Sequence, residues 1–399
     1  MKIAVYHNLP SGGAKRALHN YVRGLVAAGH EVDAYSSPQA DEGFLDLRPL
    51  VRRYTAVPLA VAPTMLQGKV ILHELAQYTM LRVGLERHAR AVAAQIDGGG
   101  YDLAFVHHCR LTQSPWMLRH LSTPSVYYCQ EPRRTSFEYS HRVHTTLSTR
   151  RGRALQRTHL FMFESLLKPR DIEAARSADM ILANSAYSVE NIKRAYGRYA
   201  AIAYLGLDLS LFRAGDRARE RAVVSVGALH PAKGHELVIE AAGTIAADRR
   251  PVVHLVADRA LEGQRATLAA LAQGSGVAVE FHQAISDNAL VERYGSVRAT
   301  VCAAELEPFG FTPIESMACG TPVVAVREAG YRETVIDGVN GALVARDPRA
   351  MGAAIAQILD EEERWQRLRE GALESGARWT LEAADARLAE LFGEALAAR

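Results

Sequence analysis

The stretch of sequence that decides the fold runs from residue 307 to residue 326 and reads EPFGFTPIESMACGTPVVAV. It follows an apolar run, Ala299–Ala303, and its last five residues form a second one. Two buried strands on either side of a short helix predict a βαβ unit with parallel strands. We expect Thr312 at the N-cap of the helix, a proline at its first position and Glu315 in its first turn, which makes Thr312 and Glu315 a capping box.

The same alternation of apolar runs and helical periods extends along the whole chain. The first half opens on a strand, Lys2–Tyr6, followed by a turn at residues 8–13 and a helix that ends near Gly29. A long helical period covers residues 70–96. Further strands are predicted from Val32 and at Leu103–Val106, Ser125–Cys129, Met180–Ala183, Val223–Val226, Val252–Ala257 and Val277–Phe281. This pattern predicts an α/β chain of two doubly wound, Rossmann-like domains facing each other. Ligands bind at the carboxyl ends of such strands, so we expect the site in a cleft between the domains.

Composition places the chain among globular proteins. Of its 399 residues 48% are hydrophobic and 23% charged, which excludes disordered and fibrous classes. No apolar run approaches the roughly 18 residues that a membrane helix needs. The first residues become polar directly after Tyr6, too early for a signal peptide. The four cysteines contain no CxxC pair, so we expect a reduced, cytoplasmic protein with buried thiols.

Charge is distributed unevenly between the two halves. Residues 1–200 carry 26 Lys and Arg against 16 Asp and Glu, whereas residues 201–399 carry 21 against 28. The excess is concentrated between residues 133 and 170, where the basic residues are Arg133, Arg134, Arg142, Arg150, Arg151, Arg153, Arg157, Lys168 and Arg170. Two interpretations stay open: a solvated helix face, or contact with an anionic acceptor or membrane surface. We expect no nucleic-acid partner, because no binding motif accompanies the charge.

The loop after residue 303 is a candidate anion-binding site. Glu307 lies in this loop, and the backbone N–H groups of Phe309, Gly310 and Phe311 precede or begin the following helix. Amides at a helix N-terminus form a cradle suited to a diphosphate. Taken singly, Glu307 is explained as a solvated loop acid and Glu315 as part of the helix cap.

The run as a whole resembles the E-x7-E signature of retaining nucleotide-sugar glycosyltransferases of the GT-B fold, glycosyltransferase family 4. The resemblance implies that Glu307 binds the donor sugar and Glu315 the nucleotide ribose. Residues 225–242, SVGALHPAKGHELVIEAA, resemble the first strand and helix of the family's donor domain, and Lys233 matches the lysine that holds the donor diphosphate. The family's arginine is replaced by Ala228.

Arg259 and His230 are the candidates to replace that arginine. We include Arg259 among the donor-binding residues.

The resemblance also assigns an acceptor side. Gly12 and Gly13 match the family's glycine-rich turn, which approaches donor phosphates and acceptor. Gln130 stands where the family usually has a histidine that contacts the transferred sugar; an amide can hydrogen-bond a hydroxyl but carries no proton charge. At the end of a strand, His107 is a candidate for acceptor binding and His108 for catalysis; the alternative is a structural role.

Arg133 and Arg134 complete the expected acceptor site. The expected catalytic set is Glu307, Lys233, Gln130 and His108.

The implied activity is transfer of a hexosyl group, with retention, from GDP-mannose or a UDP-hexose to a hydroxyl of a glycan or a lipid-linked acceptor, by front-face attack without a covalent enzyme intermediate. No D-x-D occurs and no His/Cys group has metal-ligand spacing, so we expect no metal and no cofactor besides the donor. The implied domains are an acceptor domain over 1–205, a donor domain over 206–380 and a helix over 381–399 that returns to the first domain.

Two alternatives remain open: a non-catalytic protein that binds nucleotide sugars, and a GT-B epimerase or phosphorylase. The expected location is cytoplasmic, at the inner face of the plasma membrane if the basic segment contacts anionic lipid.

Overall fold

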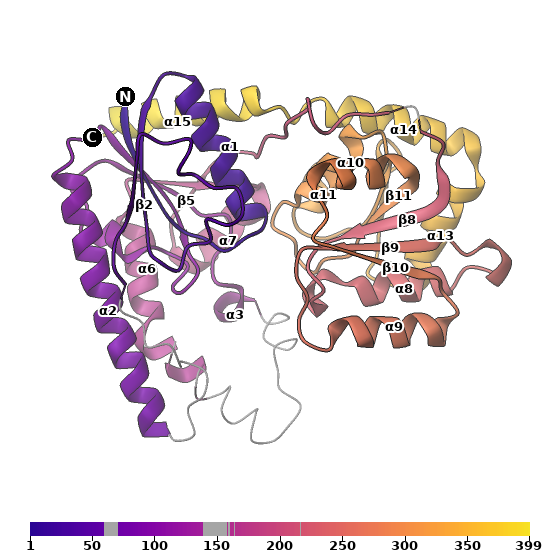
Figure 1. Cartoon of the computed structure of the whole chain (residues 1–399), viewed down its shortest axis with the longest axis horizontal. Helices are drawn as coiled ribbons and strands as arrows, with labels where there is room; N and C mark the ends of the chain where they lie inside the picture. The colour runs from indigo at the N-terminus through magenta and orange to yellow at the C-terminus, as the bar shows by residue number, and fades with distance from the viewer. Residues whose placement is uncertain (60–70, 139–157, 159, 163, 216) are drawn as a thin grey trace. The chain divides into compact units, whose positions relative to one another are not determined.

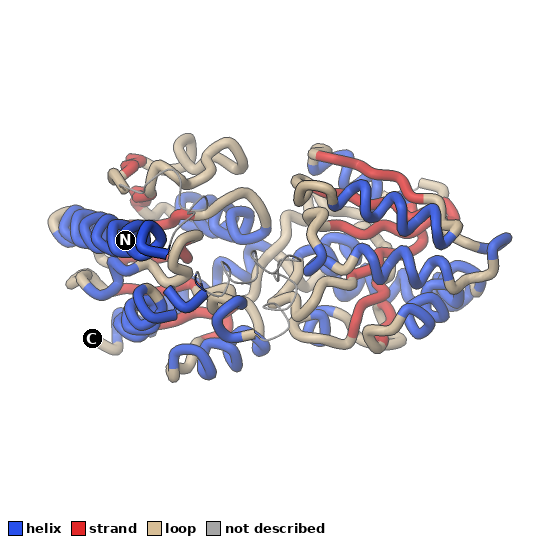
Figure 2. Tube along the Cα trace, turned by 90° about the horizontal axis from the view of Figure 1, so that it is seen from below, coloured by secondary structure: helices blue, strands red, loops and turns tan. Residues whose placement is uncertain are grey.

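The computed structural model describes the chain apart from residues 60–70, 139–157, 159, 163 and 216, and it divides into two compact units (Figure 1). The first unit comprises Met1–Tyr204 together with Ala384–Arg399, and the second comprises Leu205–Ala383. Each unit contains one parallel sheet with helices packed against it (Figure 2).

The first unit has a seven-stranded sheet in the order β3-β2-β1-β4-β5-β6-β7. Its strands are β1 (Lys2–Asn8), β2 (Glu31–Ser36), β3 (Arg53–Ala56), β4 (Leu103–Cys109), β5 (Ser125–Tyr128), β6 (Met180–Ala183) and β7 (Ala201–Ile202). Every described pairing is parallel, from Ile3 beside Val32 to Leu182 beside Ala201. The strand order reverses between β1 and β4, so the carboxyl ends of these two strands form the switch point at which doubly wound sheets bind ligands.

Helices cover the first sheet and complete its core. They are α1 (Gly13–Ala27), α2 (Ile71–Asp97), η1 (Trp116–Arg119), α3 (Arg134–Phe137), α6 (Lys168–Ser177), α7 (Ala186–Tyr196) and α15 (Leu381–Ala397). Helix α1 buries Leu18, Tyr21 and Val22 on one face, as its 3.6-residue period predicts. From the far end of the chain, Phe392 of α15 meets Phe105 of β4 edge-on, with 5.2 Å between ring centroids. The last helix therefore supplies part of the core of the first unit.

The second unit has a six-stranded sheet in the order β10-β9-β8-β11-β12-β13. Its strands are β8 (Glu220–Val226), β9 (Val252–Ala257), β10 (Val279–Gln283), β11 (Val297–Cys302), β12 (Val323–Val326) and β13 (Gly341–Val344). Its helices are η2 (Pro231–Lys233), α8 (His235–Gly243), η3 (Ala247–Arg249), α9 (Gln264–Ser275), α10 (Asp287–Ser296), α11 (Phe311–Ala318), α12 (Tyr331–Thr334), α13 (Pro348–Asp360) and α14 (Glu362–Gly376). The switch point of this sheet lies between β8 and β11.

The structure corrects the predicted start of helix α11. The helix begins at Phe311, and Gly310, with φ 82°, is its N-cap. Thr312 therefore lies inside the helix, and the predicted capping box between Thr312 and Glu315 is wrong. A glycine at this entry is required because the left-handed region disfavours side chains and because a Cβ would lie 3.0 Å from a ring carbon of Tyr331.

The expectation that the thiols are buried is confirmed. All four cysteines are free and buried, and burial raises the pKa of the Cys319 thiol to about 12. Within the described part of the chain, no helix combines the length and apolar character needed to cross a bilayer.

Candidate functional site

The carboxyl ends of β8 and β11 form the switch point of the second sheet. They bring together two of the residues that the sequence analysis assigned to the donor site. Lys233 ends η2 in the connection after β8, and Glu307 lies in the loop after β11. Lys233 Nζ lies 2.7 Å from Glu307 Oε2, although 74 positions separate them in the sequence. Both side chains remain partly exposed, so the pair is accessible to a ligand. An ammonium beside a carboxylate offers one group to a phosphate and one to sugar hydroxyls.

Backbone contacts lock the two loops together directly behind this pair. The Glu305 amide donates to the Ala232 carbonyl at 2.9 Å. Gly234 adopts φ 69° and packs so closely that a Cβ would overlap the carbonyl oxygen of Ala303. Lys233 and Glu307 are thus carried by one rigid backbone assembly.

An arginine from beyond β13 braces the same loop. Arg346 donates to the carbonyls of Ala303 at 2.9 Å and Ala304 at 3.0 Å. Its guanidinium also contacts Glu328 at 2.7 Å, which compensates its charge. Arg346 therefore holds the backbone from which Glu307 projects.

The residues between Glu307 and α11 divide into packing side chains and exposed backbone. Phe309 is buried, with its ring 5.3 Å from that of Trp379 and 6.2 Å from that of Phe311. The side chain of Phe309 thus anchors the loop, and what this segment offers an anion is its main chain at the N-terminus of α11. The predicted cradle of Phe309, Gly310 and Phe311 lies at the start of the helix that bears Glu315.

Glu315 has a partner that the sequence argument missed. Its side chain is buried in α11, and Tyr294 of α10 donates a hydrogen bond to Oε2 at 2.8 Å. Burial and the neighbouring Glu315 charge raise the pKa of Tyr294 well above its usual value, so its hydroxyl stays protonated and keeps donating. The 21-residue separation carries no local pattern from which this contact could have been found.

The structure places both candidates for the missing arginine near Ala228. The Leu229 amide donates to the Arg259 carbonyl at 2.9 Å, so the loop after β9 runs beside the loop after β8, with Arg259 exposed. His230 has a local role, because its Nδ1 accepts the Ala232 amide at 3.1 Å and caps η2. Arg259 is therefore the better placed of the two candidates.

In the first unit, the glycine-rich turn lies beside the segment that contains Gln130. Gly12, with φ 127°, is the N-cap of α1, and Gly13 is its first residue. Gln130 Nε2 donates to the Ala14 carbonyl at 3.4 Å, and Ser188 donates to the Gln130 carbonyl at 2.7 Å. Gly12, Gly13 and Gln130, which the sequence argument assigned to one site, thus lie together.

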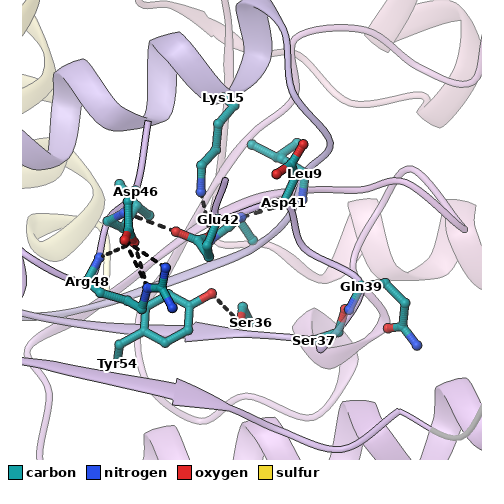
Figure 3. A network of polar contacts seen from close by, with 12 residues as sticks. Leu9, Lys15, Ser36, Ser37, Gln39, Asp41, Glu42, Asp46, Arg48 and Tyr54 are labelled. Carbon is teal, nitrogen blue, oxygen red and sulfur yellow. Dashed lines mark hydrogen bonds and ion pairs between the residues drawn. The ribbon is translucent and has the colours of Figure 1, made fainter. Parts of the chain in front are cut away.

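A buried charged network supports this turn (Figure 3). The fully buried Lys15 of α1 extends its ammonium to Glu42, in the loop after β2, at 2.5 Å. Nε2 of His7, at the end of β1, lies 3.1 Å from the same carboxylate. Burial alone would raise the pKa of Glu42, but contacts with His7, the Leu47 amide and Lys15 hold it well below its usual value. Glu42 therefore stays ionised and compensates the buried ammonium.

Sequence reasoning missed Lys15, Glu42 and His7. The available signal was a lysine placed on the apolar face of the predicted first helix.

The two histidines at the end of β4 differ in their surroundings. His107 is fully buried, with its ring 4.6 Å from that of Phe105 and 5.3 Å from that of Tyr128. Burial lowers the pKa of His107 well below its usual value and that of His108 to about 4. Both imidazoles are therefore neutral at pH 7. The burial of His107 fits the alternative of a structural role, whereas His108 is partly exposed.

The two arginines after β5 have partners within the first unit. Arg133 donates to the Leu111 carbonyl at 3.1 Å, and burial lowers its pKa. Arg134 pairs with Glu138 at 2.6 Å. Arg142, Arg150, Arg151, Arg153 and Arg157 lie outside the described residues.

Comparisons with known proteins show similarity over much of the chain. Residues 211–375 match the family model for glycosyl transferases group 1. D-inositol 3-phosphate glycosyltransferase of Thermobispora bispora is 31% identical over 242 residues, covering 55% of this chain and 56% of that protein. The protein of the same name in Geodermatophilus obscurus is 31% identical over 293 residues, covering 68% and 62%. The chain thus spans about three fifths of the length of these curated relatives.

Solved structures match along nearly the whole chain. Sucrose-phosphate synthase from Thermosynechococcus elongatus superposes with a TM-score of 0.74 and 21% identity, covering 100% of both chains. HepE from Anabaena in complex with UDP-glucose gives a TM-score of 0.73 and 20% identity, covering 99% of this chain and 100% of that chain. At these identities the likeness concerns the fold. The predicted fold class is confirmed: two Rossmann-like units with parallel sheets, as in GT-B proteins.

Proposed function

We propose that this protein is a retaining glycosyltransferase that moves a hexosyl group from a nucleoside diphosphate sugar to a hydroxyl acceptor. The proposal depends above all on the contact between Lys233 and Glu307 at the switch point of the second sheet. The match of residues 211–375 to group 1 glycosyl transferases supports it. GDP-mannose and UDP-hexoses, the donors that the family resemblance implies, are the ones to test. One similar structure is a complex with UDP-glucose, which supports the choice of UDP-hexoses.

In this proposal the second unit holds the donor. The Lys233 ammonium and the N-terminus of α11 stabilise the leaving diphosphate, with the Arg259 guanidinium as a second cation. Glu307 accepts hydrogen bonds from the transferred sugar, and Glu315, fixed by Tyr294, faces the ribose. As the donor binds, its phosphate replaces Glu307 as the partner of Lys233, which leaves the carboxylate to the sugar hydroxyls.

The first unit then supplies the acceptor side through Gly13, Gln130, His108 and the basic segment after β5. A neutral His108 and an amide at Gln130 orient hydroxyls by hydrogen bonds and add no positive charge. The basic excess of this unit favours an anionic acceptor, and the relatives named for D-inositol 3-phosphate make a phosphorylated polyol the first acceptor to try.

The deciding experiment measures nucleotide release from a panel of GDP- and UDP-sugars, with and without acceptors. The wild type is expected to release nucleotide from one donor class. Glu307→Gln is expected to reduce turnover at least a hundredfold with the fold intact, because it removes a carboxylate that the donor sugar requires. Glu262→Gln, an exposed carboxylate elsewhere in the second unit, is the matched control. Normal turnover of Glu307→Gln would contradict the assigned role.

The same panel separates the proposal from a protein that only binds nucleotide sugars. Such a protein would show a thermal shift with one donor class and no release of nucleotide. An epimerase would change the sugar without consuming an acceptor hydroxyl.

A further inference from the structure

Three metal-ligating side chains meet on the two outermost strands at one edge of the second sheet. His254 belongs to β9, and Glu280 and His282 belong to β10. In the parallel register Glu280 lies opposite His254 and His282 lies opposite Val256. Because side chains two positions apart on a strand share a face, the three side chains project from the same face of the sheet.

That face is distinct from the one covered by α8 and α9. Phe281, which alternates with the two ligand-type residues of β10, points the other way, with Arg265 of α9 4.9 Å above its ring. On the face of His254, Arg293 of α10 approaches the imidazole (Figure 1 shows α10 and α9 on opposite sides of the strands). The three side chains thus lie between the sheet edge and α10, away from the Lys233 and Glu307 pair on the β8 and β11 loops.

The three facing atoms have the spacing of ligands around one ion. His254 Nδ1 lies 3.1 Å from His282 Nε2 and 3.3 Å from Glu280 Oε2, and these last two atoms are 3.8 Å apart. A circle through the three atoms has a radius of about 2.0 Å, which matches zinc bonds to nitrogen and carboxylate oxygen of about 2.0–2.2 Å. Ligands of a tetrahedral ion with such bonds are about 3.3 Å apart, whereas neighbouring octahedral ligands are about 3.0 Å apart. The observed spacing favours the tetrahedral case.

We propose that His254 Nδ1, His282 Nε2 and a Glu280 oxygen form a binding site for a divalent transition-metal ion, best suited to Zn²⁺, with water as the fourth ligand. Two imidazoles and one carboxylate are a ligand set that zinc uses in proteins and that Mg²⁺ does not prefer. This site is independent of the proposed transferase function.

The three proposed ligands differ in solvent exposure. The His254 side chain is buried, that of His282 is mostly buried, and that of Glu280 is 59% exposed, so an ion can enter past the carboxylate. Burial, and then the charge of Arg293, lower the pKa values of both histidines. Neutral imidazole is the form that binds metal.

The far nitrogen of His254 has a carboxylate within reach. Nε2 lies 3.8 Å from Glu220 of β8, and Arg293 lies 3.4 Å from the same nitrogen. Metal on Nδ1 requires the proton on Nε2, a form that cannot accept a hydrogen bond from Arg293 and that has the Glu220 carboxylate as its available acceptor. A cation so close to the ion also opposes binding. Removal of the Arg293 charge should therefore strengthen the site.

The expected role is to fasten the edge strand. Strand β10 has a neighbour on one side only, β9, and the ion joins the two through side chains in addition to the backbone ladder. An edge strand with an otherwise open row of backbone groups gains most from such a link.

The test is calorimetric titration of Zn²⁺ into the full-length protein after chelator treatment and dialysis. The wild type is expected to bind one ion per chain, with Mg²⁺ unable to compete. Glu280→Gln and His282→Gln, at exposed and partly exposed positions, are expected to weaken binding at least tenfold. Arg293→Gln is expected to tighten it several-fold. Co²⁺ bound in the same site should give the visible absorption of a tetrahedral complex.

The matched control is His120→Gln, which removes a histidine 2.9 Å from Glu86 in the first unit. It should bind zinc as the wild type does, and urea unfolding should show all variants folded. Absence of binding by the wild type would overturn the proposal, as would equal affinity in Glu280→Gln and His282→Gln, or competition by Mg²⁺. Nucleotide release, measured in parallel, should be the same in every variant, which keeps this result separate from the proposed function.

Discussion

The proposed chemistry depends on two residues in contact, Lys233 with its ammonium and Glu307 with its carboxylate. The sequence indicated both because each lies in a recognisable run after a predicted strand. The sequence could not reveal the distant partners of the site residues, such as Tyr294, which donates a hydrogen bond to Glu315. Such contacts are set by how helices pack, and no local spacing encodes them.

At the donor site we expect turnover to survive an excess of EDTA. Lys233 and the amides at the start of α11 supply the positive field for the leaving diphosphate. Among the described residues, no group of three metal-ligating side chains lies at this loop, and its Glu307 already pairs with Lys233. EDTA should lower the melting temperature of the second unit if zinc binds at His254, without stopping transfer. Loss of turnover in EDTA that Mg²⁺ or Mn²⁺ restores would contradict this leaving-group site.

A second residue-scale prediction concerns Asp171, buried in the first turn of α6. Its carboxylate accepts the Ser114 amide at 2.6 Å, yet burial raises its pKa to about 8. Between pH 4 and pH 8 the unfolded chain releases this proton and the folded chain keeps it, so the group lowers stability as the pH rises. Asp171→Asn abolishes that titration.

Relative to the wild type, Asp171→Asn should gain at least about 1 kcal/mol in free energy of unfolding between pH 5 and pH 8, measured in urea. Asp258→Asn, at an exposed loop position, is the control and should show no such trend. A constant difference across the pH range for Asp171→Asn would disprove the explanation.

At the scale of elements, the entry to α11 shows where sequence patterns mislead. Thr312, a proline and Glu315 match the capping-box pattern, but the observed N-cap is Gly310, two residues earlier. A capping box needs an N-cap residue with extended backbone and a side-chain oxygen. Here the N-cap is a glycine with positive φ and no side chain, so no capping box can form. The pattern located the helix correctly and misplaced its first residue.

The connection between η2 and α8 gives an element-scale prediction. At Gly234 an alanine combines φ 69° with an overlap against the Ala303 carbonyl, so Gly234→Ala should cost more than about 2 kcal/mol of stability in urea unfolding. Gly263→Ala is the matched control, because φ there is 76° but a Cβ would meet nothing within 4 Å. It should cost about 1 kcal/mol. Equal losses would show that the contact with Ala303 is unimportant.

For the molecule as a whole, the sequence predicted the alternation of strands and helices and hence the two Rossmann-like sheets. It missed three strands, Arg53–Ala56, Ala201–Ile202 and Gly341–Val344. Ala201–Ile202 is only two residues long, and the polar Arg53–Ala56 has no apolar run and is a strand because it pairs with β2. The histidines of the proposed metal site were equally invisible, since strand register, and not spacing, brings them together.

The uneven charge of the chain leads to a prediction at the same scale. We propose that the basic segment between residues 133 and 170 attracts anionic lipid, at about 1 kcal/mol for each basic residue near the surface. Liposome co-sedimentation should show binding to anionic vesicles that weakens at high salt, because the attraction is screened over roughly 8 Å. Substitution of Arg150, Arg151 and Arg153 by glutamate should weaken it further. Equal partitioning to neutral and anionic vesicles, or none, would leave the segment a solvated face.

The packing of Phe392 against Phe105 has a consequence for the order in which the protein matures during synthesis. The second unit is one continuous segment, so all of its residues have been translated once Ala383 is added. The first unit waits for α15, although most of it is translated first. Until α15 leaves the ribosome, Phe105 in the first sheet lacks the packing partner that Phe392 provides. The half of the protein whose synthesis starts first is therefore the half whose last residues are made last.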